Sequence, residues 1–468
     1  MSQNASPLNP LSMSRGSLEN LLLTYYGDDL TGSTDVMEAL QWGGVPTVLF
    51  FDPPDAETLR TRFPYARAVG VAGVSRSMTP AQMDAALPSA FAALGALGAP
   101  IFHYKICSTF DSSPTIGSIG RATTIGMDVF GAACVPLVVG APILKRYVAF
   151  SNLFARVDDV TYRLDRHPTM SRHPVTPMRE ADLRLHLGQQ TERQIAAINV
   201  LHLSRSAADL RAYYDELAVN GAEIVLFDTV DDAHVRAIGG LIGTLETPLF
   251  LVGSSGVEYA LIAHWQAVGS ASVAPPPTPP RAVDQIVVMS GSAAPMTGDQ
   301  IAWAGQNGFA LIRLHAPDLI DPSTAAQAQA QSVQAALDAL AVGQNVVLYS
   351  AQYPDDPAIP ATNARIEQIG GAARDIGRAL GTVQGAILRD ILAETGLRRA
   401  VITGGDTCGY AARQLGIVAL EARTPIAPGA PLCSAHSDDP RIDGMEIALK
   451  AGQVGKIDYF SSILRGYA

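Results

Sequence analysis

The sequence is poor in charge, and in basic charge most of all. Charged residues make up 16% of the 468 positions, and 33 lysines and arginines face 44 acids, for a formal net charge of −11. Nucleic acids and anionic membranes are bound through basic surfaces, so this balance argues against both as partners. A small anionic ligand stays open, because a few cations and backbone N–H groups can hold a phosphate or carboxylate inside an acidic protein.

Several motifs that would indicate a chemistry directly are missing. The four cysteines are widely spaced with no C-x-x-C pair, which is typical of reduced thiols in a cytosolic protein. The nine histidines form neither H-x-x-x-H nor H-E-x-x-H, so no zinc site is expected. There is no Walker A loop and no G-x-G-x-x-G fingerprint, which argues against P-loop enzymes and dinucleotide-binding dehydrogenases.

Long hydrophobic runs are absent as well. The most apolar segment, Gly131 to Ile143, is much shorter than the roughly 20 residues that a membrane span requires. Residues 1–19 are polar and lack the apolar stretch of a signal peptide, and we expect a flexible tail there. These features predict a soluble, cytoplasmic protein with no membrane partner.

Material for a core is ample, since 48% of the residues are hydrophobic. One boundary stands out: the segment Ser272 to Pro280 carries five prolines in nine residues. Such a segment can neither pair as a strand nor coil as a helix, so it predicts an extended linker. We therefore expect a first domain over 20–271, a linker over 272–281 and a second domain over 282–468.

A short apolar strand, a Gly/Ser/Asp/Thr loop and an alanine-rich helix follow one another repeatedly. Strands that alternate with helices predict an α/β fold, here two domains with mostly parallel sheets flanked by helices. Ligands bind at the carboxyl ends of such strands, which places the expected site in the cleft between the domains. Thr176 predicts the cap of a further helix over Met178 to Leu187. The repeated pattern occupies residues 21–42, 248–265, 285–305 and 400–415.

Two adjacent carboxylates follow the first predicted strand. Asp28 and Asp29 precede a helix that we expect from about Thr34 to Trp42. One of them, or Thr31, would suffice to cap this helix. The other would then be available to orient or deprotonate a substrate hydroxyl, or to bind a metal. Because adjacent side chains point in different directions, we expect one chemical and one structural role.

Two cations also follow predicted strands. Arg76 comes after the strand Ala68 to Ala72, and Lys105 ends a strand that begins near Ala99. An ammonium beside several hydroxyls suits a small carboxylate that itself carries hydroxyl groups. A solvated lysine and an exposed loop arginine are the alternatives. The polar side chains that crowd the loop after Lys105 are Ser108, Thr109, Asp111, Ser112 and Ser113.

Glycine loops mark the second half. The segment Gly404 to Gly409 lies between a predicted strand and a predicted helix. Its glycines would let the backbone approach a phosphate, and the helix N-terminus would donate N–H groups. A plain strand-to-helix turn is the alternative. A second glycine loop, Gly452 to Gly455, follows a lysine.

These motifs, in this order, resemble those of the four-carbon acid sugar kinase family. Asp28 to Ser33 is similar to its Asp-Asp-Phe-Thr-Gly-Ala, and Lys105 to Thr109 is similar to its Lys-x-x-Ser-Thr. Gly404 to Thr407 resembles its Gly-Gly-Asp/Glu-Thr, and Leu449 to Gly455 resembles its Leu-Lys-x-Gly-x-x-Gly. The resemblance extends from about Leu21 to Phe460. Further similar segments are Ser75-Arg76, Gly117 to Gly120 and Ser290 to Ser292.

The resemblance implies an N-terminal domain that binds an acid sugar and a C-terminal domain that binds a nucleotide. It implies transfer of the γ-phosphate of ATP to a hydroxyl of a sugar acid such as erythronate, threonate or 3-oxo-tetronate. The implied sugar-acid contacts are Asp28, Arg76, Lys105, Ser108 and Thr109, with Asp111 in the same loop. The implied ATP contacts are Ser290, Ser292, Gly404, Gly405, Asp406, Thr407 and Gly452.

The sequence departs from the family pattern in the loop after Lys105. The run Cys107 to Asp111 replaces the commoner Ile-Asp-Ser-Thr-Leu-Arg, so an acid has moved and an arginine is missing. The Phe-Asp form is similar to the 3-oxo-tetronate branch, but Ser112 to Gly120 does not follow that branch throughout. The sequence therefore leaves open which sugar acid is bound.

We interpret the chain as an ATP-dependent kinase for a small sugar acid, acting on its terminal hydroxyl. Arg76 and Lys105 would hold the substrate carboxylate, and Asp28 or Asp29 would deprotonate the hydroxyl. The Gly404 loop would hold the phosphates of ATP together with Mg²⁺. An NAD(P)-dependent sugar-acid dehydrogenase and a non-catalytic sugar-acid-binding protein are the alternatives. The number of subunits is open, with a homodimer as one alternative.

Overall fold

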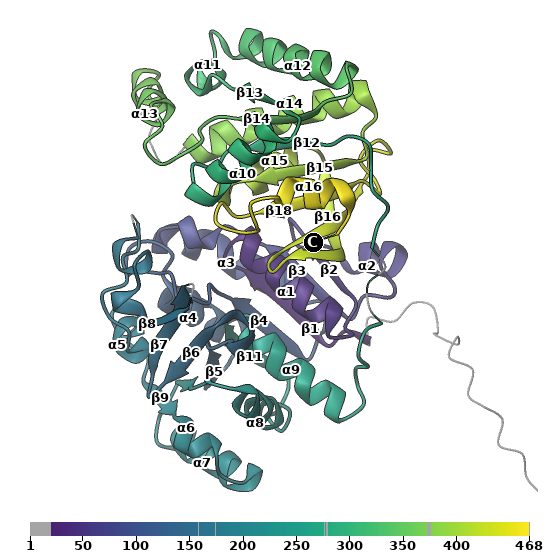
Figure 1. Ribbon diagram of the computed structural model, residues 1–468. Helices are drawn as coiled ribbons and strands as arrows, with labels where there is room; N and C mark the ends of the chain where they lie inside the picture. Colours follow the sequence, from purple (N-terminus) through teal and green to yellow (C-terminus); the bar gives the residue numbers. More distant parts are fainter. Residues whose placement is uncertain are drawn as a thin grey trace, which may run out of the picture.

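A computed structural model describes residues 20–157, 159–173, 175–275, 277, 279–371 and 376–467. The predicted tail, residues 1–19, lies outside the described residues, as do Pro276 and Thr278 of the predicted linker. The described chain is a two-domain α/β structure whose halves lie one above the other in Figure 1. The chain passes from one to the other between α9 (Gly256–Ala267) and β12 (Val287–Ser290), and the described residues of this segment form neither helix nor strand.

The first half is built on a parallel sheet whose strands are buried on both faces, as their continuous apolar sequences predict. Its order is β2-β3-β1-β4-β11-β5-β10-β9. A separate antiparallel sheet of β6, β7 and β8 lies beside it. The bounds are β1 Leu23–Gly27, β2 Thr47–Phe50, β3 Ala68–Ala72, β4 Ile101–Lys105, β5 Val135–Val138, β6 Arg146–Ala149, β7 Asn152–Val157, β8 Val160–Arg163, β9 Ile195–Ile198, β10 Ile224–Phe227 and β11 Leu249–Gly253.

Helices connect these strands, and two of them depart from prediction. Helix α1 begins at Leu30 rather than near Thr34, because Asp29 caps it. Helix α5 begins at Leu183 rather than at Met178, capped by Asp182. The other helices are α2 Ala56–Arg62, α3 Pro80–Gly95, α4 Ile119–Phe130, α6 Val200–Leu203, α7 Ala207–Val219 and α8 Asp232–Ile242.

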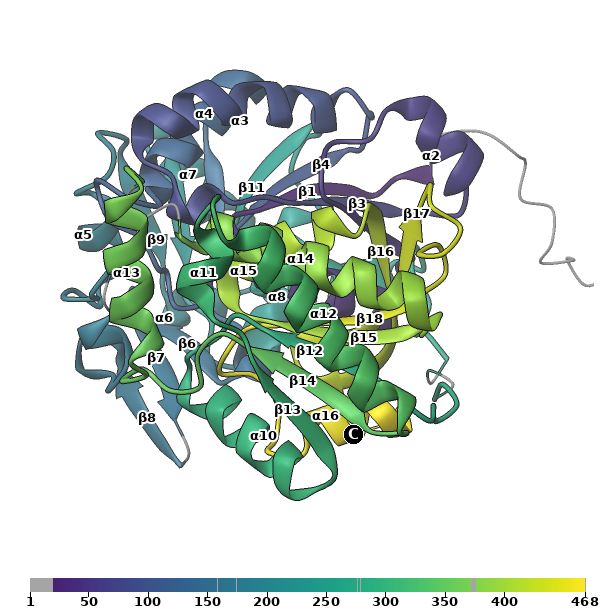
Figure 2. The ribbon, with the colours of Figure 1, turned by 90° about the horizontal axis from the view of Figure 1, so that it is seen from above.

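The second half repeats the α/β principle with the parallel order β13-β14-β12-β15-β18. Figure 2 shows these strands between α10 and α16 on one face and α12, α14 and α15 on the other. The bounds are β13 Phe309–Arg313, β14 Asn345–Tyr349, β15 Arg399–Thr403, β18 Glu446–Lys450, α10 Pro295–Gln306, α11 Ala316–Ile320, α12 Ala325–Ala341, α13 Ala358–Gln368, α14 Ile376–Thr395, α15 Gly405–Gln414 and α16 Tyr459–Arg465.

The sheets of the two halves are joined, whereas two separate sheets were expected. A hairpin of β16 (Ile417–Ala427) and β17 (Ala430–Ser437) leaves the second half, and β16 pairs antiparallel with β2. Within the described residues, 15 strands therefore form one continuous sheet. Each half covers an edge strand of the other, so neither exposes unpaired backbone groups at the junction. One cluster of buried apolar side chains likewise includes residues of both halves.

Candidate active site between the two halves

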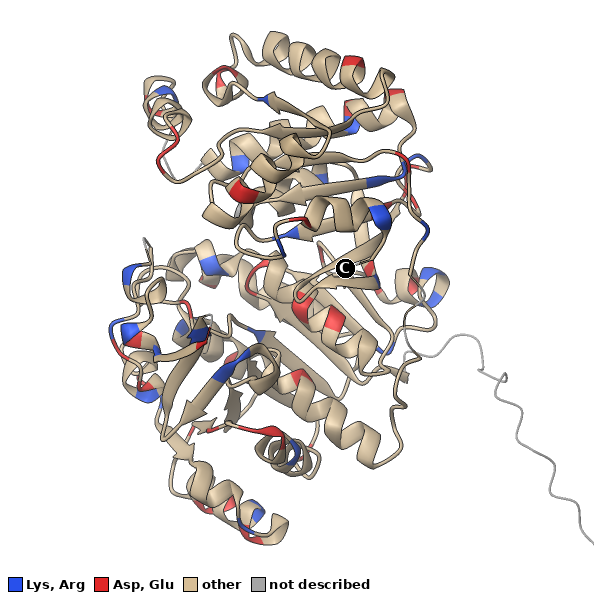
Figure 3. Cartoon of the chain, in the orientation of Figure 1, with Lys and Arg blue, Asp and Glu red and all other residues tan. Residues whose placement is uncertain are grey.

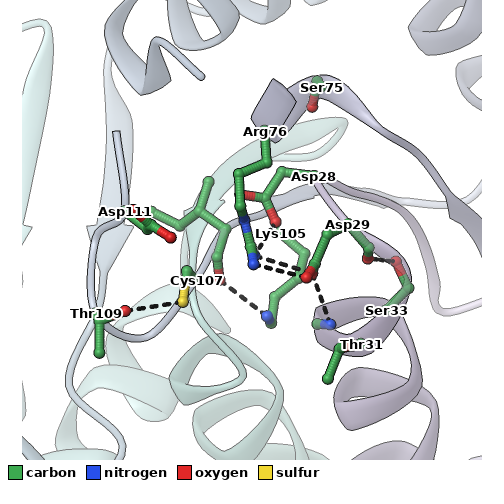
Figure 4. A network of polar contacts seen from close by, with 12 residues as sticks. Asp28, Asp29, Thr31, Ser33, Ser75, Arg76, Lys105, Cys107, Thr109 and Asp111 are labelled. Carbon is green, nitrogen blue, oxygen red and sulfur yellow. Dashed lines mark hydrogen bonds and ion pairs between the residues drawn. The ribbon is translucent and has the colours of Figure 1, made fainter. Parts of the chain in front are cut away.

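Two carboxylates and an arginine form a cluster at the carboxyl ends of β1 and β3 (Figure 4). Asp29 caps α1 by accepting a hydrogen bond from Gly32 N at 2.7 Å. Arg76 donates to the two oxygens of Asp28 at 2.7 and 3.1 Å and to those of Asp29 at 2.6 and 2.9 Å. The expectation that the two carboxylates point apart is wrong, because one planar guanidinium presents N–H groups to both.

The two carboxylates differ in accessibility. The side chain of Asp28 is 3% exposed and that of Asp29 is 23% exposed. Burial raises the pKa of Asp28, although the charge of Arg76 acts to lower it. Arg76 donates to both oxygens of each carboxylate, so exposure alone makes Asp29 the carboxylate that a ligand can reach.

Lys105 ends β4 and lies beside this cluster. Its side chain is buried and donates to Ile106 O at 2.8 Å, so the alternative of a solvated lysine is wrong. A Cβ atom on Gly32 would lie 2.8 Å from Lys105 Nζ and 2.7 Å from Asp29 Oδ1. The ammonium, the carboxylate and the first turn of α1 therefore converge on one point.

Asp35, which the sequence analysis did not single out, belongs to the same region. Burial raises its pKa, while the nearby ammonium of Lys105 acts to lower it. Asp35 lies on the second turn of α1, six residues after Asp29. It lies just beyond the Asp28 to Ser33 motif, on a helix in which a lone acid carries no sequence signal of a site.

The loop after β4 carries the other predicted sugar-acid contacts. Thr109 is buried, with its hydroxyl 3.0 Å from Cys107 Sγ, and Ser108 is half-buried. Asp111 accepts a hydrogen bond from Thr176, whose hydroxyl also lies 2.9 Å from His173 Nδ1. Thr176 is therefore engaged by this loop instead of capping a helix, which explains the late start of α5.

In the second half, three loops at the ends of β12, β15 and β18 pack closely together. Gly404 has φ = +143°, a conformation that L side chains rarely adopt, and a Cβ atom there would collide with the hydroxyl of Thr407. A Cβ atom on Gly452 would likewise collide with Ser292 Oγ. Ser290 lies fully buried beneath them. The structure thus brings the predicted ATP contacts together, apart from the side chain of Asp406, which lies outside the described residues.

Two polar groups in these loops point to a ligand site. The buried hydroxyl of Thr407 has no hydrogen-bond partner within the described chain. Lys450, at the end of β18, donates to Thr297 Oγ1, Thr403 Oγ1 and Ala451 O at 3.0, 3.0 and 3.1 Å. The sequence shows this lysine beside a glycine loop but indicates no role for it, because the threonines that surround it are distant in sequence.

A pocket beside the Asp28–Asp29–Arg76 cluster is lined by residues of both halves. From the first half, Asp28, Asp29 and Arg76 line it, and from the second half α15 contributes Gly405 at its N-terminus and Arg413 near its end. Arg413 also donates to Phe51 O at 2.5 Å and pairs with Asp52, which connects α15 to the end of β2. The predicted acids and the start of the Gly404 loop's helix therefore meet at one pocket. Several other predicted site residues do not line it: Lys105, Ser108, Thr109, Asp111, Ser290, Ser292, Gly404, Thr407 and Gly452.

The described residues contain neither a metal-binding cluster nor a membrane-spanning helix. No group of three or more His, Cys, Asp or Glu residues suitable for a metal ion occurs in the described part of the chain. No helix among the described residues is both long and apolar enough to cross a bilayer. Lysines and arginines are dispersed among acids over both halves (Figure 3).

Each half of the chain matches a known protein-family model. A family model described as a sugar-binding N-terminal domain matches residues 23–261, and one described as a nucleotide-binding C-terminal domain matches residues 287–460. Two solved structures share the fold. One, from Salmonella typhimurium LT2, is described as a candidate tRNA synthase (TM-score 0.74, 25% identity, 96% of this chain and 99% of that chain). The other is a DUF1537-family protein from Haemophilus influenzae (TM-score 0.68, 23% identity, 94% and 98%).

Curated relatives are similar over almost the whole chain. A 3-oxo-isoapionate kinase from Paraburkholderia graminis is 48% identical over 95% of this chain and 94% of its own. A 3-oxo-tetronate kinase from Burkholderia multivorans is 30% identical over 95% of this chain and 97% of its own. The family predicted from the motifs is thereby confirmed. With its sugar-binding and nucleotide-binding halves and kinase relatives of full length, this chain belongs to the four-carbon acid sugar kinase family.

Proposed function

We propose that this chain is an ATP-dependent kinase that phosphorylates a hydroxyl of a small 3-oxo sugar acid, with 3-oxo-isoapionate as the first candidate. The observation that carries the proposal is the pocket in which Asp29 and Arg76 of one half face the N-terminal end of α15 of the other. The 48% identity to a 3-oxo-isoapionate kinase supports the choice of substrate over 3-oxo-tetronate, whose named kinases are 28–30% identical.

Asp29 is the proposed base. It is the accessible carboxylate, and Arg76 with the Gly32 amide holds it in one orientation. It would take the proton of the substrate hydroxyl while that oxygen attacks the γ-phosphorus in line and ADP leaves. Asp28 is the proposed partner that holds Arg76 from its buried side.

The substrate carboxylate is proposed to lie near Arg76 and Lys105. Arg76 is 24% exposed between its two carboxylate partners, and Lys105 adds a buried ammonium from beneath α1. Thr109 and Ser108 would contact hydroxyl or oxo groups, with Asp111 at the edge of the same loop. These assignments come from the family resemblance and are supported by the position of the loop at the end of β4, next to β1.

The phosphates of ATP are proposed to lie at the Gly404 loop, with Ser290, Ser292, Gly405, Asp406, Thr407 and Gly452 around them. Backbone N–H groups at the start of α15 and the unpartnered hydroxyl of Thr407 are suitable donors. Mg²⁺ is proposed to arrive with the nucleotide, because it binds mainly to phosphates and water and needs only one or two protein carboxylates. It would offset the charge of the transferred group.

The test is a coupled assay of ADP release with 3-oxo-isoapionate, 3-oxo-tetronate, threonate and erythronate. ATP-dependent turnover with a higher kcat/KM for 3-oxo-isoapionate is the expected result. Turnover that prefers 3-oxo-tetronate would correct the substrate alone. Substrate binding without ADP release would favour a binding protein, and a change in NAD(P)H absorbance would favour a dehydrogenase.

The domain limits and the location are part of the same proposal. The limits 20–271 and 282–468 are supported by the two family matches, which end and begin on either side of the proline-rich segment. A cytoplasmic location is supported by the use of ATP and by the wide spacing of the four cysteines in the sequence, which is typical of reduced thiols.

A further inference from the structure

Lys450 is a buried cation whose hydrogen-bond acceptors in the described residues are all neutral. It is 1% exposed, and its ammonium donates to two threonine hydroxyls and one backbone carbonyl, all of them neutral. Among the residues that the structure describes, no carboxylate is paired with it. Burying an ammonium in the protein interior costs desolvation free energy unless an anion lies nearby. We therefore expect a bound anion near Lys450.

The hydrogen bonds of this ammonium reach all three loops of the proposed nucleotide site. Thr403 directly precedes Gly404, and Ala451 directly precedes Gly452. Thr297 lies in the first turn of α10, which follows the loop after β12. The Thr297 hydroxyl in turn donates to Gly452 O at 2.6 Å. The side chain of Lys450 therefore links the segments that follow β12, β15 and β18 through hydrogen bonds.

We propose that Lys450 is a positioning residue for the nucleotide, whose charge compensates the phosphates of bound ATP and whose hydrogen bonds hold the three loops around them. The inference rests on the proposed function, because it takes the phosphates as the missing counterion. Lys450 is not a catalytic residue, since its donors are directed at the protein.

This assignment has a consequence for the pH dependence of binding. Burial lowers the pKa of Lys450 to about 8, with Cys408 on α15 acting in the opposite direction. The ring of Tyr459 on α16 lies 5.8 Å from Nζ, and burial keeps the pKa of its hydroxyl well above the ordinary value. Phosphates that bind nearby would raise the pKa of Lys450. Affinity for ATP should then fall about tenfold from pH 7 to pH 9, as the ammonium loses its proton.

The experiment is isothermal titration of the full chain with MgATP at pH 7, 8 and 9, in buffers of different ionisation enthalpy. We expect the wild-type chain to take up protons on binding at pH 8. Lys450→Met should bind about tenfold more weakly than wild type at pH 7 and show no pH dependence. Cys408→Ser should keep the wild-type profile, and Thr297→Val should bind more weakly yet retain the pH dependence.

A wild-type affinity that is flat between pH 7 and pH 9 would overturn the inference, as would loss of the dependence in Cys408→Ser. Wild-type affinity in Lys450→Met would do the same. If Lys450→Met does not fold, the wild-type and Cys408→Ser profiles still decide. A chain that binds ATP as expected but transfers no phosphate refutes the proposed function and leaves this inference standing, whereas a chain that binds no nucleotide refutes both.

Discussion

The substitution Asp29→Asn tests the proposed role of Asp29 as a base while keeping its role as the cap of α1. Asparagine caps helices as well as aspartate does, so its side-chain oxygen can still accept the hydrogen bond from Gly32 N that starts α1. It cannot accept the proton of a substrate hydroxyl. Loss of a general base lowers kcat by roughly 10²- to 10⁴-fold, and we expect a fall in this range.

The same substitution should change stability only slightly. The ion pair between Asp29 and Arg76 is about a quarter exposed on both sides, so its loss is expected to cost about 1 kcal/mol or less. Arg76 keeps its two hydrogen bonds to Asp28. The midpoint of thermal unfolding, followed by circular dichroism, should therefore stay close to that of the wild-type chain.

The matched control is Asp28→Asn, which alters the buried neighbour in the same cluster. This substitution removes the charge of Asp28, which burial disfavours. It also weakens the hydrogen bonds from Arg76 to Asp28, each worth roughly 1.5–3 kcal/mol. We expect a measurable loss of stability and a smaller loss of kcat than in Asp29→Asn, both measured by ADP release and thermal melts. The reasoning is refuted if Asp29→Asn keeps near-normal kcat while Asp28→Asn abolishes turnover.

Three further substitutions test other parts of the structure. Lys105→Met should raise KM for the sugar acid and leave KM for ATP largely unchanged; equal effects on both would contradict the division between the halves. Gly404→Ala should weaken ATP binding at least tenfold, measured by calorimetry, and leave the sugar-acid site intact. The added Cβ would collide with Thr407, and alanine disfavours φ = +143°. An unchanged affinity for ATP would show that the Gly404 loop is not part of the nucleotide site. Glu38 of the first half accepts a hydrogen bond from Gly429 N of the second half, and burial raises the pKa of Glu38 to about 7. The contribution of Glu38 to the free energy of unfolding is therefore present below about pH 4.5 and is lost as the pH rises through 7. Urea unfolding should show a flatter pH profile for Glu38→Gln, and an identical profile would exclude this contact as the cause.

Much of the fold could be predicted because its signals are local. Buried parallel strands are continuous apolar runs, as the sequences of β10 (Ile224–Phe227) and β14 (Asn345–Tyr349) show. The loops that follow them carry the glycines and acids of the motifs. Helix starts were less predictable, as α5 shows, because Thr176 is engaged by a loop 65 residues earlier.

The junction of the two halves could not be predicted. A proline-rich segment between two α/β patterns is equally compatible with two independent sheets and with one shared sheet. The pairing of β16 with β2 joins residues about 370 positions apart, such as Leu49 and Leu420. Nothing in the local pattern of either strand indicates its partner, because both are apolar and could pair at any free edge.

The sequence by itself determined the kind of chemistry: the family, the two functional halves and the residue types at the strand ends, since these depend on motifs of a few consecutive residues. The tertiary structure decided what those residues do to one another. It placed Asp28 and Asp29 on the same guanidinium, buried Lys105 beneath α1, and gathered Lys450 with Thr297 and Thr403. Such contacts join side chains 47 to 153 residues apart. They arise from the packing of parallel strands, which brings distant loops to one edge of the sheet.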